Sequence, residues 1–576
     1  MPSELERTPD RPTVRVLSRR SFLLLAGSTS SLVLLAACSG GAPPTPAAPG
    51  AVTQVPVNVP QTIPTSVPAT AAVQPAATAA PTVARAEPKG QVVYAWHTTI
   101  SPAWLDPQEN PPQVTPYNFD YALHDALVKH VPGKPLAPSL AESYEMAPDY
   151  KSATFKLRPG IKFHDGSPVT PDDVKFTFEQ YRGSNASILH EKTASIESPD
   201  SRTIRFLFKE PFLDFPILYG SPASGAGWIV PKAYYEKVGP NGFKQAPIGA
   251  GPYKFVKQQA GTEVEFEAFT DYWRKTPNVK TLIMKGVPEG ATRVALLRTG
   301  EADIVNLIPG ELLDSVKSDP KLQLAPNAGG TIWIDFPGFT EPDSPFHDVR
   351  VRQAVSLAID RQAINEAEYG GLAPGGGNWI PEDYPGAIQR PAPPFELARA
   401  KQLMAEAGVP DGFDVEQLTP LPPYFSQAER VVSQLRAINI RTKVNTMERA
   451  AFYEKLANGP NRLKGLIMAF SGAPGDAAAR IRENVMCSGA FSGTCLPEIE
   501  SRMAKYDASA DPKERQQLME DVQAYILDNY IVVPVMRQAF INAMGPRIAN
   551  KVTDVIGAIP QYPYTGPYED MMLKEG

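Results

Sequence analysis

Apolar and polar residues alternate at several places in the first half of the 576-residue chain, as they do in half-buried β-strands. The clearest strand-like segments are residues 91–96, 154–158, 204–208 and 263–268. A short helix is expected to begin after Thr170, because threonine can cap a helix and Pro171 fits the first helical position. The first half is therefore predicted to consist mainly of strands with short helices.

The second half carries more helical patterns. Asp348 begins a segment in which apolar residues recur on one helical face up to Ile359, and residues 395–407 show a second apolar stripe that ends at Gly408. Residues 530–535 then return to a strand pattern. This mixture predicts an α/β fold. Residues 89–576 are too many for one core of ordinary size, so two lobes are expected.

The N-terminal segment indicates export. Arg19 and Arg20 precede an uncharged apolar stretch, residues 22–37, which is typical of a twin-arginine signal peptide. A transmembrane helix is the alternative. However, a helix of this length spans about 24 Å, less than the roughly 30 Å hydrocarbon core of a bilayer.

A lipid-attachment motif ends this segment. Leu35-Ala36-Ala37-Cys38 resembles a lipobox, in which the Cys38 thiol accepts a diacylglycerol before cleavage. A chance cysteine beside an ordinary cleavage site is the alternative. Residues 39–88 are rich in Pro, Ala and Thr, so they are predicted to form an extended tether rather than a packed core. The signal peptide is assigned to residues 1–38.

Charge and cysteine content restrict the remaining possibilities. Removing residues 1–38 changes the net charge from −6 to −8, and no block of Lys or Arg indicates a nucleic-acid partner. After lipidation of Cys38, only Cys487 and Cys495 remain, and the turn-rich segment between them allows a disulfide. Two reduced thiols, one of them serving a metal, are the alternative. The histidines show no metal-ligand spacing, so no metal or cofactor is predicted.

Four motifs occur in the order typical of one protein family. The first contains PSLAESY at 138–144 and FKLRPGIKFHDGSPVTPDDV at 155–174, and the second is GAGPYKF at 249–255. DYW at 271–273 with ALLRTGEADI at 295–304 forms the third, and PFHDVRVRQA at 345–354 with AIDR at 358–361 forms the fourth. In these motifs the chain resembles the peptide/nickel-type solute-binding proteins of ABC importers, extracellular solute-binding protein family 5.

The resemblance implies the large, type II (cluster C) periplasmic-binding-protein fold, in which two lobes close on a ligand about a hinge. Two chain crossings are expected, near residues 325–330 and 535–542. The first lobe would comprise 89–327 and 540–576, and the second 328–539. The implied function is capture of a small solute, peptide-like by preference, for an ABC permease and its ATPase, by a monomer anchored at the extracytoplasmic face of the membrane.

The resemblance also directs attention to loops that follow strands of both lobes, because the family's cleft is lined by such loops. An enclosed site combines apolar walls with a few polar anchors. The candidate substrate-binding residues are Trp96, His97, Trp333, Asp335, Trp379, Phe470 and Asp476.

Asp476 is the most specific of these candidates. Peptide-binding relatives carry an acidic, aromatic loop after the corresponding strand, and an aspartate there pairs with the peptide's α-ammonium group. Here the tyrosine and the paired acids are missing and only Asp476 remains, one or two positions away. A solvated loop acid is the alternative, and the departure weakens the expectation of a peptide ligand, because the family also takes up oligosaccharides, nickel complexes, opines and haem.

Other functions remain open from the sequence. An exported hydrolase is one alternative, but the chain has no G-x-S-x-G and no H-E-x-x-H motif, so no catalytic residue is predicted. His164 beside Asp165 is expected to belong to a turn between a strand and a capped helix. A ligand sensor or chaperone with the same fold is the second alternative, since the binding protein's sequence does not name its partner.

Overall fold

A computed structural model of the chain describes residues 87–110, 114–183, 185–219, 226–457, 463–471, 476–489, 491–557 and 566–575. These residues belong to one unit, Thr82–Gly576. The predicted signal peptide, Cys38 and nearly all of the tether fall on residues 1–86, outside the described residues.

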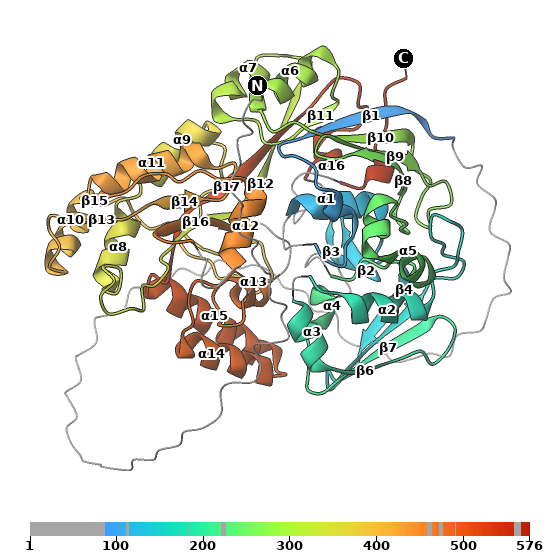
Figure 1. Cartoon of the computed structure of the whole chain (residues 1–576), viewed down its shortest axis with the longest axis horizontal. Helices are drawn as coiled ribbons and strands as arrows, with labels where there is room; N and C mark the ends of the chain where they lie inside the picture. The colour runs from blue at the N-terminus through green and yellow to red at the C-terminus, as the bar shows by residue number, and fades with distance from the viewer. Residues whose placement is uncertain are drawn as a thin grey trace, which may run out of the picture. The chain divides into compact units, whose positions relative to one another are not determined.

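One nine-stranded sheet runs through both lobes (Figure 1). Its strands lie in the order β14-β16-β12-β17-β11-β1-β10-β9-β8. Their bounds are β1 Lys89–Trp96, β8 Tyr253–Gln259, β9 Glu263–Ala268, β10 Val279–Gly286, β11 Ile304–Val305, β12 Gln323–Asp335, β14 Leu418–Pro420, β16 Leu466–Ser471 and β17 Val532–Met544. The mixture of parallel and antiparallel pairs, with helices packed against the sheet, confirms the predicted α/β fold class.

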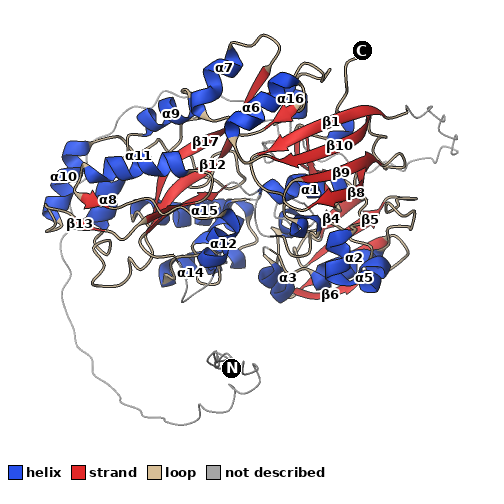
Figure 2. Ribbon diagram, turned by 45° about the horizontal axis from the view of Figure 1, so that its top comes forward, coloured by secondary structure: helices blue, strands red, loops and turns tan. Residues whose placement is uncertain are grey.

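The two longest strands cross between the lobes (Figure 2). β12 and β17 pair antiparallel from Gln323↔Met544 to Asp335↔Val532, and the register shifts between Ala328 and Thr331. On the first-lobe side β17 also pairs with β11, and on the second-lobe side β12 also pairs with β16. Both predicted crossings therefore lie inside these strands. The predicted lobe limits at 327/328 and 539/540 fall within the same two strands and stay a prediction.

Smaller sheets complete the architecture. A four-stranded sheet in the first lobe has the order β4-β5-β7-β6, and two pairs, β2-β3 and β13-β15, lie apart from it. The bounds are β2 Val128–Val131, β3 Lys134–Pro138, β4 Ala141–Met146, β5 Ser152–Leu157, β6 Thr193–Glu197, β7 Thr203–Phe208, β13 Phe413–Asp414 and β15 Ile440–Arg441. In β5 and β7 every second residue is buried, as the alternating sequence predicts.

Local capping explains where several helices begin. Thr170 and Asp173 form a reciprocal capping box at the start of α2 (Pro171–Gln180), and Asp348 caps α8 (Val349–Leu357). The other helices are α1 Val114–Leu123, α3 Ala186–Lys192, α4 Phe215–Leu218, α5 Lys232–Gln245, α6 Gly290–Thr299, α7 Leu313–Lys317, α9 Arg361–Tyr369, α10 Leu397–Glu406, α11 Phe425–Arg436, α12 Arg449–Ala457, α13 Ala477–Asn484, α14 Pro497–Ala508, α15 Pro512–Asp528 and α16 Val552–Val555. Short 3₁₀ segments in the described part of the chain are η1 Pro102–Leu105, η3 Gly310–Leu312 and η5 Tyr568–Asp570.

The core consists of separate hydrophobic clusters on the two faces of the large sheet. Val92, Tyr94 and Trp96 of β1 belong to a cluster with α1 and the C-terminal segment, whereas Val93 and Ala95 belong to a larger cluster that includes α6 of the first lobe and extends through the second lobe. A third cluster lies between the four-stranded sheet and α2. One second-lobe residue, Ala479 of α13, packs into this third cluster, so α13 touches the core of the first lobe.

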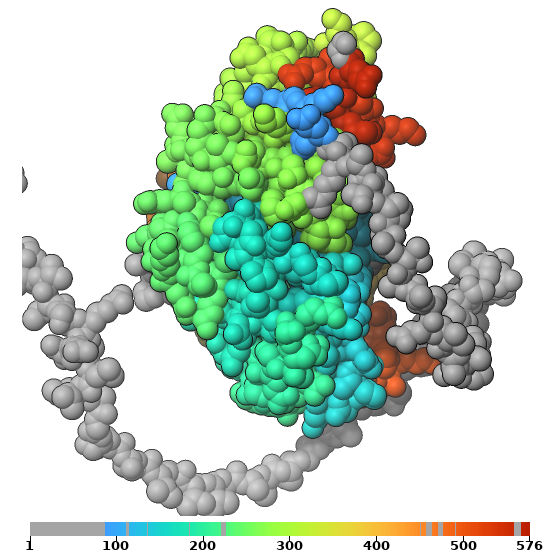
Figure 3. Space-filling model, turned by 90° about the vertical axis from the view of Figure 1, so that its right-hand side faces the viewer, coloured from blue at the N-terminus to red at the C-terminus, as the bar shows by residue number. Residues whose placement is uncertain are grey.

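The C-terminal segment is tied to the first lobe by ion pairs. Arg274 Nε lies 2.6 Å from Oε1 of the fully buried Glu569, and Arg274 also contacts Asp570. Figure 3 shows this segment, in red, beside the blue first strand. Arg547 donates to the carbonyl of Gln91 at 2.8 Å. The end of the chain is therefore part of the first lobe's structure.

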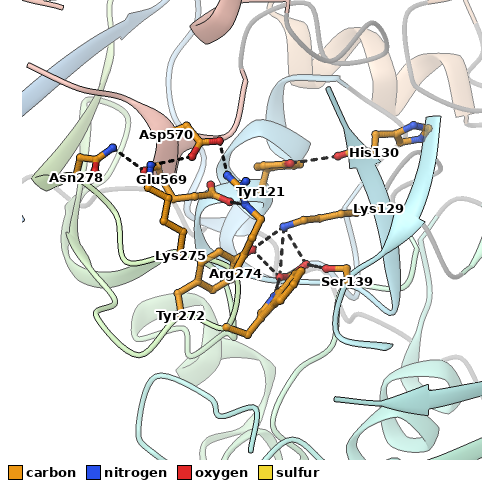
Figure 4. A network of polar contacts seen from close by, with 12 residues as sticks. Tyr121, Lys129, His130, Ser139, Tyr272, Arg274, Lys275, Asn278, Glu569 and Asp570 are labelled. Atoms are coloured by element: carbon orange, nitrogen blue, oxygen red, sulfur yellow. Dashed lines mark hydrogen bonds and ion pairs between the residues drawn. The ribbon is translucent and has the colours of Figure 1, made fainter. Parts of the chain in front are cut away.

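A buried charge network lies beneath this segment (Figure 4). Lys129 Nζ, which is almost fully buried, lies 3.2 Å from Oδ1 of Asp125 and 2.7 Å from the hydroxyl of Tyr272. Asp125 also accepts hydrogen bonds from Ser139 Oγ and Trp273 Nε1. Such a buried carboxylate is tolerated only because every side of it meets a donor.

Replacing Lys129 tests this network. Lys129→Met is expected to lower the free energy of unfolding by about 3–5 kcal/mol, because it leaves the Asp125 carboxylate buried without its counter-charge. Urea denaturation of residues 89–576 followed by circular dichroism measures the change. Asp414→Asn is the control, since Asp414 pairs with Arg441 on an exposed surface and should change stability by less than about 1 kcal/mol. Equal effects of the two substitutions would contradict the assignment.

Candidate ligand-binding site

Helix α13 is buried along its whole length although half of its residues are polar. Arg480, Arg482, Glu483 and Asn484 are all at most 8 % exposed. Asp476 caps the helix by accepting a hydrogen bond from Ala479 N at 2.8 Å. A helix with charges around its circumference cannot be buried in an apolar core. Its position between the lobes supplies the polar partners.

The charges around α13 come from both lobes. We refer to Lys192, Asp214, Asp476, Arg482, Asp507 and Arg515 as the interlobe charge cluster. Asp214 of the first lobe receives Arg515 Nη2 at 2.6 Å, and Arg482 Nη2 lies 3.6 Å away. Arg482 also pairs with Asp507, and Lys192 lies 3.7 Å from the same carboxylate. The cluster therefore joins the lobes by ion pairs that are largely shielded from solvent.

Two cavities between the lobes are lined by members of this cluster. The larger has a volume of about 770 Å³ and is bordered by α3 of the first lobe and by α12, α13 and the segment after α13. A volume of this size lies within the range of about 300–1,000 Å³ that is usual for small-molecule sites. The smaller cavity, of about 250 Å³, is lined by Asp214, Asp476, Tyr506 and Arg515 among others.

The electrostatics of the cluster are set by burial and by close charges. Burial, reinforced by Asp214, raises the pKa of Asp476 to about 6. For Arg482 burial lowers the pKa, but Asp507 and Asp214 outweigh it, so the pKa lies above its ordinary value. Arg482 is therefore charged at every physiological pH, whereas Asp476 changes its charge near pH 6.

A third cavity, of about 280 Å³, lies beyond the ends of β1 and β14 and beside β17. His97 lines it, with its backbone N–H donating to Asn306 Oδ1 at 2.9 Å. Burial, followed by Arg449 and Arg293, holds the pKa of His97 well below its ordinary value, so the ring is neutral at pH 7.

Phe470 lies next to this third cavity. Its ring packs 5.7 Å from Tyr424 and 5.7 Å from Phe540, both of which line the cavity with His97. Because Phe470 is the penultimate residue of β16 and His97 follows β1, the carboxyl ends of strands from both lobes meet here. Ligands of open α/β sheets bind at such strand ends. Of the predicted residues, the structure brings these two into one neighbourhood.

The predicted tryptophans lie in the hydrophobic core. Trp96 is fully buried against Tyr94 and Phe119, and Trp333 meets Trp379 edge-on at 5.8 Å between ring centroids. Asp335, at the end of β12, is 4 % exposed. None of these four borders the 770, 280 or 250 Å³ cavities in the described part of the chain. Their ligand contacts stay a prediction.

Cys487 and Cys495 are joined by a disulfide in the structure. Residues beside and between them, including Met486, Ser488, Gly489 and Phe491, line the 770 Å³ cavity. The bond therefore closes the loop that forms one wall of this cavity. Sequence reasoning proposed the bond but did not connect it to the site.

Sequence reasoning missed the main polar residues of the site. Asp214, Arg482 and Arg515 are separated by up to 301 positions, and neither spacing nor motif relates them. One local signal existed, namely the run AAARIREN after Asp476, in which Arg480, Arg482 and Glu483 leave the helix in different directions. Such a pattern indicates a helix with polar neighbours on several sides.

No group of His, Cys, Asp or Glu among the residues that the structure describes is arranged to hold a metal ion. No helix among them combines the length and apolarity needed to span a bilayer.

The fold and the interlobe cavities define a two-lobed solute-binding protein. Comparison with known sequences identifies the family. The model of the bacterial extracellular solute-binding proteins, family 5 (middle region), matches residues 135–478. The chain belongs to this family.

Curated relatives bind different ligands. Heme-binding protein A of Haemophilus influenzae is 28 % identical over 465 residues, covering 73 % of this chain and 82 % of its own. The dipeptide-binding protein of Escherichia coli is 24 % identical over 519 residues, covering 83 % of this chain and 95 % of its own.

Solved structures share the fold. The binding protein AgaA of Agrobacterium tumefaciens R10 with agropinic acid has a TM-score of 0.71 and 26 % identity, covering 84 % of this chain and 99 % of its own. A dipeptide-binding protein of Pseudoalteromonas sp. SM9913 with Met-Leu has a TM-score of 0.72 at 21 % identity, covering 84 % of this chain and all of its own, which shows the fold alone.

Asp214 is expected to hold the lobes together. Asp214→Asn should shift the protein toward an open form and weaken solute binding by about tenfold or more, because Arg515 and Arg482 lose their shared first-lobe carboxylate. Small-angle scattering and fluorescence transfer between dyes on the two lobes measure the opening. Glu210→Gln is the control, since Glu210 pairs with Lys192 at a more exposed edge. An unchanged interlobe distance and affinity would show that the ion pairs do not stabilise closure.

Proposed function

We propose that this protein captures a small, peptide-like solute between its two lobes and delivers it to an ABC permease. The observation that carries the proposal is the 770 Å³ cavity, whose walls come from both lobes of a family 5 solute-binding protein. A site shared by two lobes encloses its ligand when they close, so capture and release follow the hinge. Binding requires no chemistry at the solute, and no catalytic role is assigned to any residue.

A peptide-like solute suits the polarity of the site. Apolar side chains such as Tyr453 and Phe491 share the cavity with charges of both signs, including Arg482 and Glu483. A zwitterion with an apolar substituent matches such walls. Relatives named as dipeptide-, di/tripeptide- and glutathione-binding proteins support this class of ligand, whereas the haem-binding relative represents the main alternative.

We further propose that the protein is a lipoprotein at the extracytoplasmic face of the membrane. The twin arginines Arg19-Arg20 and the lipobox ending at Cys38 support this assignment. The Pro-rich tether, residues 39–88, would let the binding unit reach a permease while Cys38 remains in the bilayer. Oxidation of Cys487 and Cys495 fits the same compartment. We propose that one copy of the chain, with the lobe limits predicted from the sequence, captures and delivers the solute as a monomer.

Identification of the bound solute tests the proposal. Residues 89–576, purified without refolding, are expected to release short peptides on collisional activation in native mass spectrometry. Asp476 lines the 250 Å³ cavity and not the 770 Å³ one, so Asp476→Asn tests whether the solute's ammonium group reaches this carboxyl: the variant should release far fewer peptides, because a neutral amide cannot replace the counter-charge of a buried ammonium. Release of one non-peptide species would discard the peptide assignment and retain solute binding. An empty protein with no thermal shift across a solute panel would favour the sensor or chaperone role.

The stability of Asp476→Asn separates a lost anchor from a damaged fold. The pKa of Asp476 rises from 3.8 in the unfolded chain to about 6 in the folded protein. Between pH 3.8 and about 6 the folded protein keeps the carboxyl proton that the unfolded chain has lost, so stability falls as the pH rises through this range. Asparagine keeps the helix cap without ionising. The variant should match the wild type near pH 4 and exceed it at pH 7.5, by at most ~3 kcal/mol. A less stable variant at pH 7.5 would contradict this account.

Substitution of Cys38 tests the anchor. Cys38→Ser should abolish incorporation of labelled fatty acid into the protein, because serine offers no thiol to the diacylglycerol. Metabolic labelling followed by immunoprecipitation measures the incorporation. Arg19→Lys with Arg20→Lys is the matched control for export, and it should leave a precursor in the cytoplasm. Equal labelling of exported Cys38→Ser and wild-type protein would refute lipid attachment at this residue.

A further inference from the structure

Arg482 differs from the other cations that line the 770 Å³ cavity. Its side chain is 8 % exposed, yet Nε and Nη1 have no hydrogen-bond partner among the described residues. Only Nη2 is engaged, by Asp507 and by Asp214. A buried N–H group without an acceptor is costly, so an acceptor from a bound solute would be favoured at this position.

The other two cations of the cavity already have partners at its edge. Arg182 Nη2 lies 2.8 Å from Glu109, and Lys192 lies 2.9 Å from Glu210. Both of these carboxylates are at least 37 % exposed, so water also screens the pairs. Among the three cations of the cavity, Arg482 is therefore the one that is most buried and still has N–H groups without an acceptor in the part of the chain that the structure describes.

The wall beside Arg482 is apolar and aromatic. Tyr453 and Phe491 pack against each other with their centroids 5.4 Å apart, and Met486 and Ile188 border the same space. The disulfide between Cys487 and Cys495 closes the loop that carries Phe491. A flat or branched apolar group fits against this wall because aromatic and thioether side chains adapt to it at low cost.

We propose that Arg482 is a specificity-determining residue that binds a carboxylate of the solute, while Tyr453 and Phe491 hold an adjacent apolar group. The proposal rests on the proposed function and narrows its ligand class. Nη1 carries two N–H groups, which suffice for charge-assisted hydrogen bonds to carboxylate oxygens. The site therefore selects peptide-like solutes that keep a free carboxylate next to an apolar residue over the same solutes with that carboxylate amidated.

A competition experiment measures this selection. Ligand-free protein, residues 89–576, is incubated with equal amounts of a dipeptide library and of the same library as C-terminal amides, and the ejected ligands are identified by native mass spectrometry. The wild type should retain the acids over the amides by about tenfold or more, the usual effect of a buried charge-assisted hydrogen bond. Arg482→Gln should lose the preference, and Arg482→Lys, which keeps the charge, should retain part of it.

Arg515→Gln is the matched control. Arg515 binds the same Asp214 but lines the 250 Å³ cavity instead, so its loss should weaken acids and amides equally and leave their ratio unchanged. Thermal melting of each variant separates lost selection from lost folding. Wild-type protein that binds both libraries equally, or Arg482→Gln that keeps the preference, would overturn the subsite and leave the proposed function intact. Wild-type protein that binds neither library would overturn the peptide assignment together with this inference.

Discussion

The antiparallel ladder between β12 and β17 is the constraint on which both lobes depend. Every other strand of the large sheet is added to one side or the other of this pair. A continuous ladder can bend only where its pairing is interrupted, and here the register shifts between Ala328 and Thr331. Gly329 lies in this interruption, where a β-carbon would stand 2.9 Å from the ring of Phe540. The carbonyl of Gly329 accepts a hydrogen bond from Arg537 Nε, so the same point is held from both strands.

Charge compensation between the lobes is the second constraint. Helix α13 carries charges that neither lobe satisfies alone, because Asp214 is supplied by the first lobe and Arg482, Asp507 and Arg515 by the second. Buried charges require partners within hydrogen-bond distance. The closed arrangement therefore supplies partners that separation of the lobes would remove, and a solute that adds an acceptor for Arg482 would favour closure further.

Local patterns predicted the elements well because they depend on neighbours in sequence. The cap at Thr170, the alternation in β5 and β7, and the helix after Asp348 were all expected from spacing, whereas the reciprocal bond from Asp173 was seen only in the structure. The α/β class followed from the mixture of strand and helix patterns, and the two crossings followed from the family resemblance. The tryptophans illustrate the limit: an aromatic residue beside a loop can serve a cleft or a core, and Trp333 and Trp379 pack on each other in the second lobe's core.

The sequence by itself determined the family, the strand and helix pattern, and the pairing of Cys487 with Cys495 as a possibility. Only the tertiary structure decided which charges meet. Asp476, expected as a ligand anchor, caps α13 and borders Asp214, whereas Arg482, six residues later, received no attention from motif or spacing. The physical reason is that a buried ion pair depends on distance and on exclusion of water. Both arise when segments such as Asp214 and Arg515, 301 positions apart, fold together.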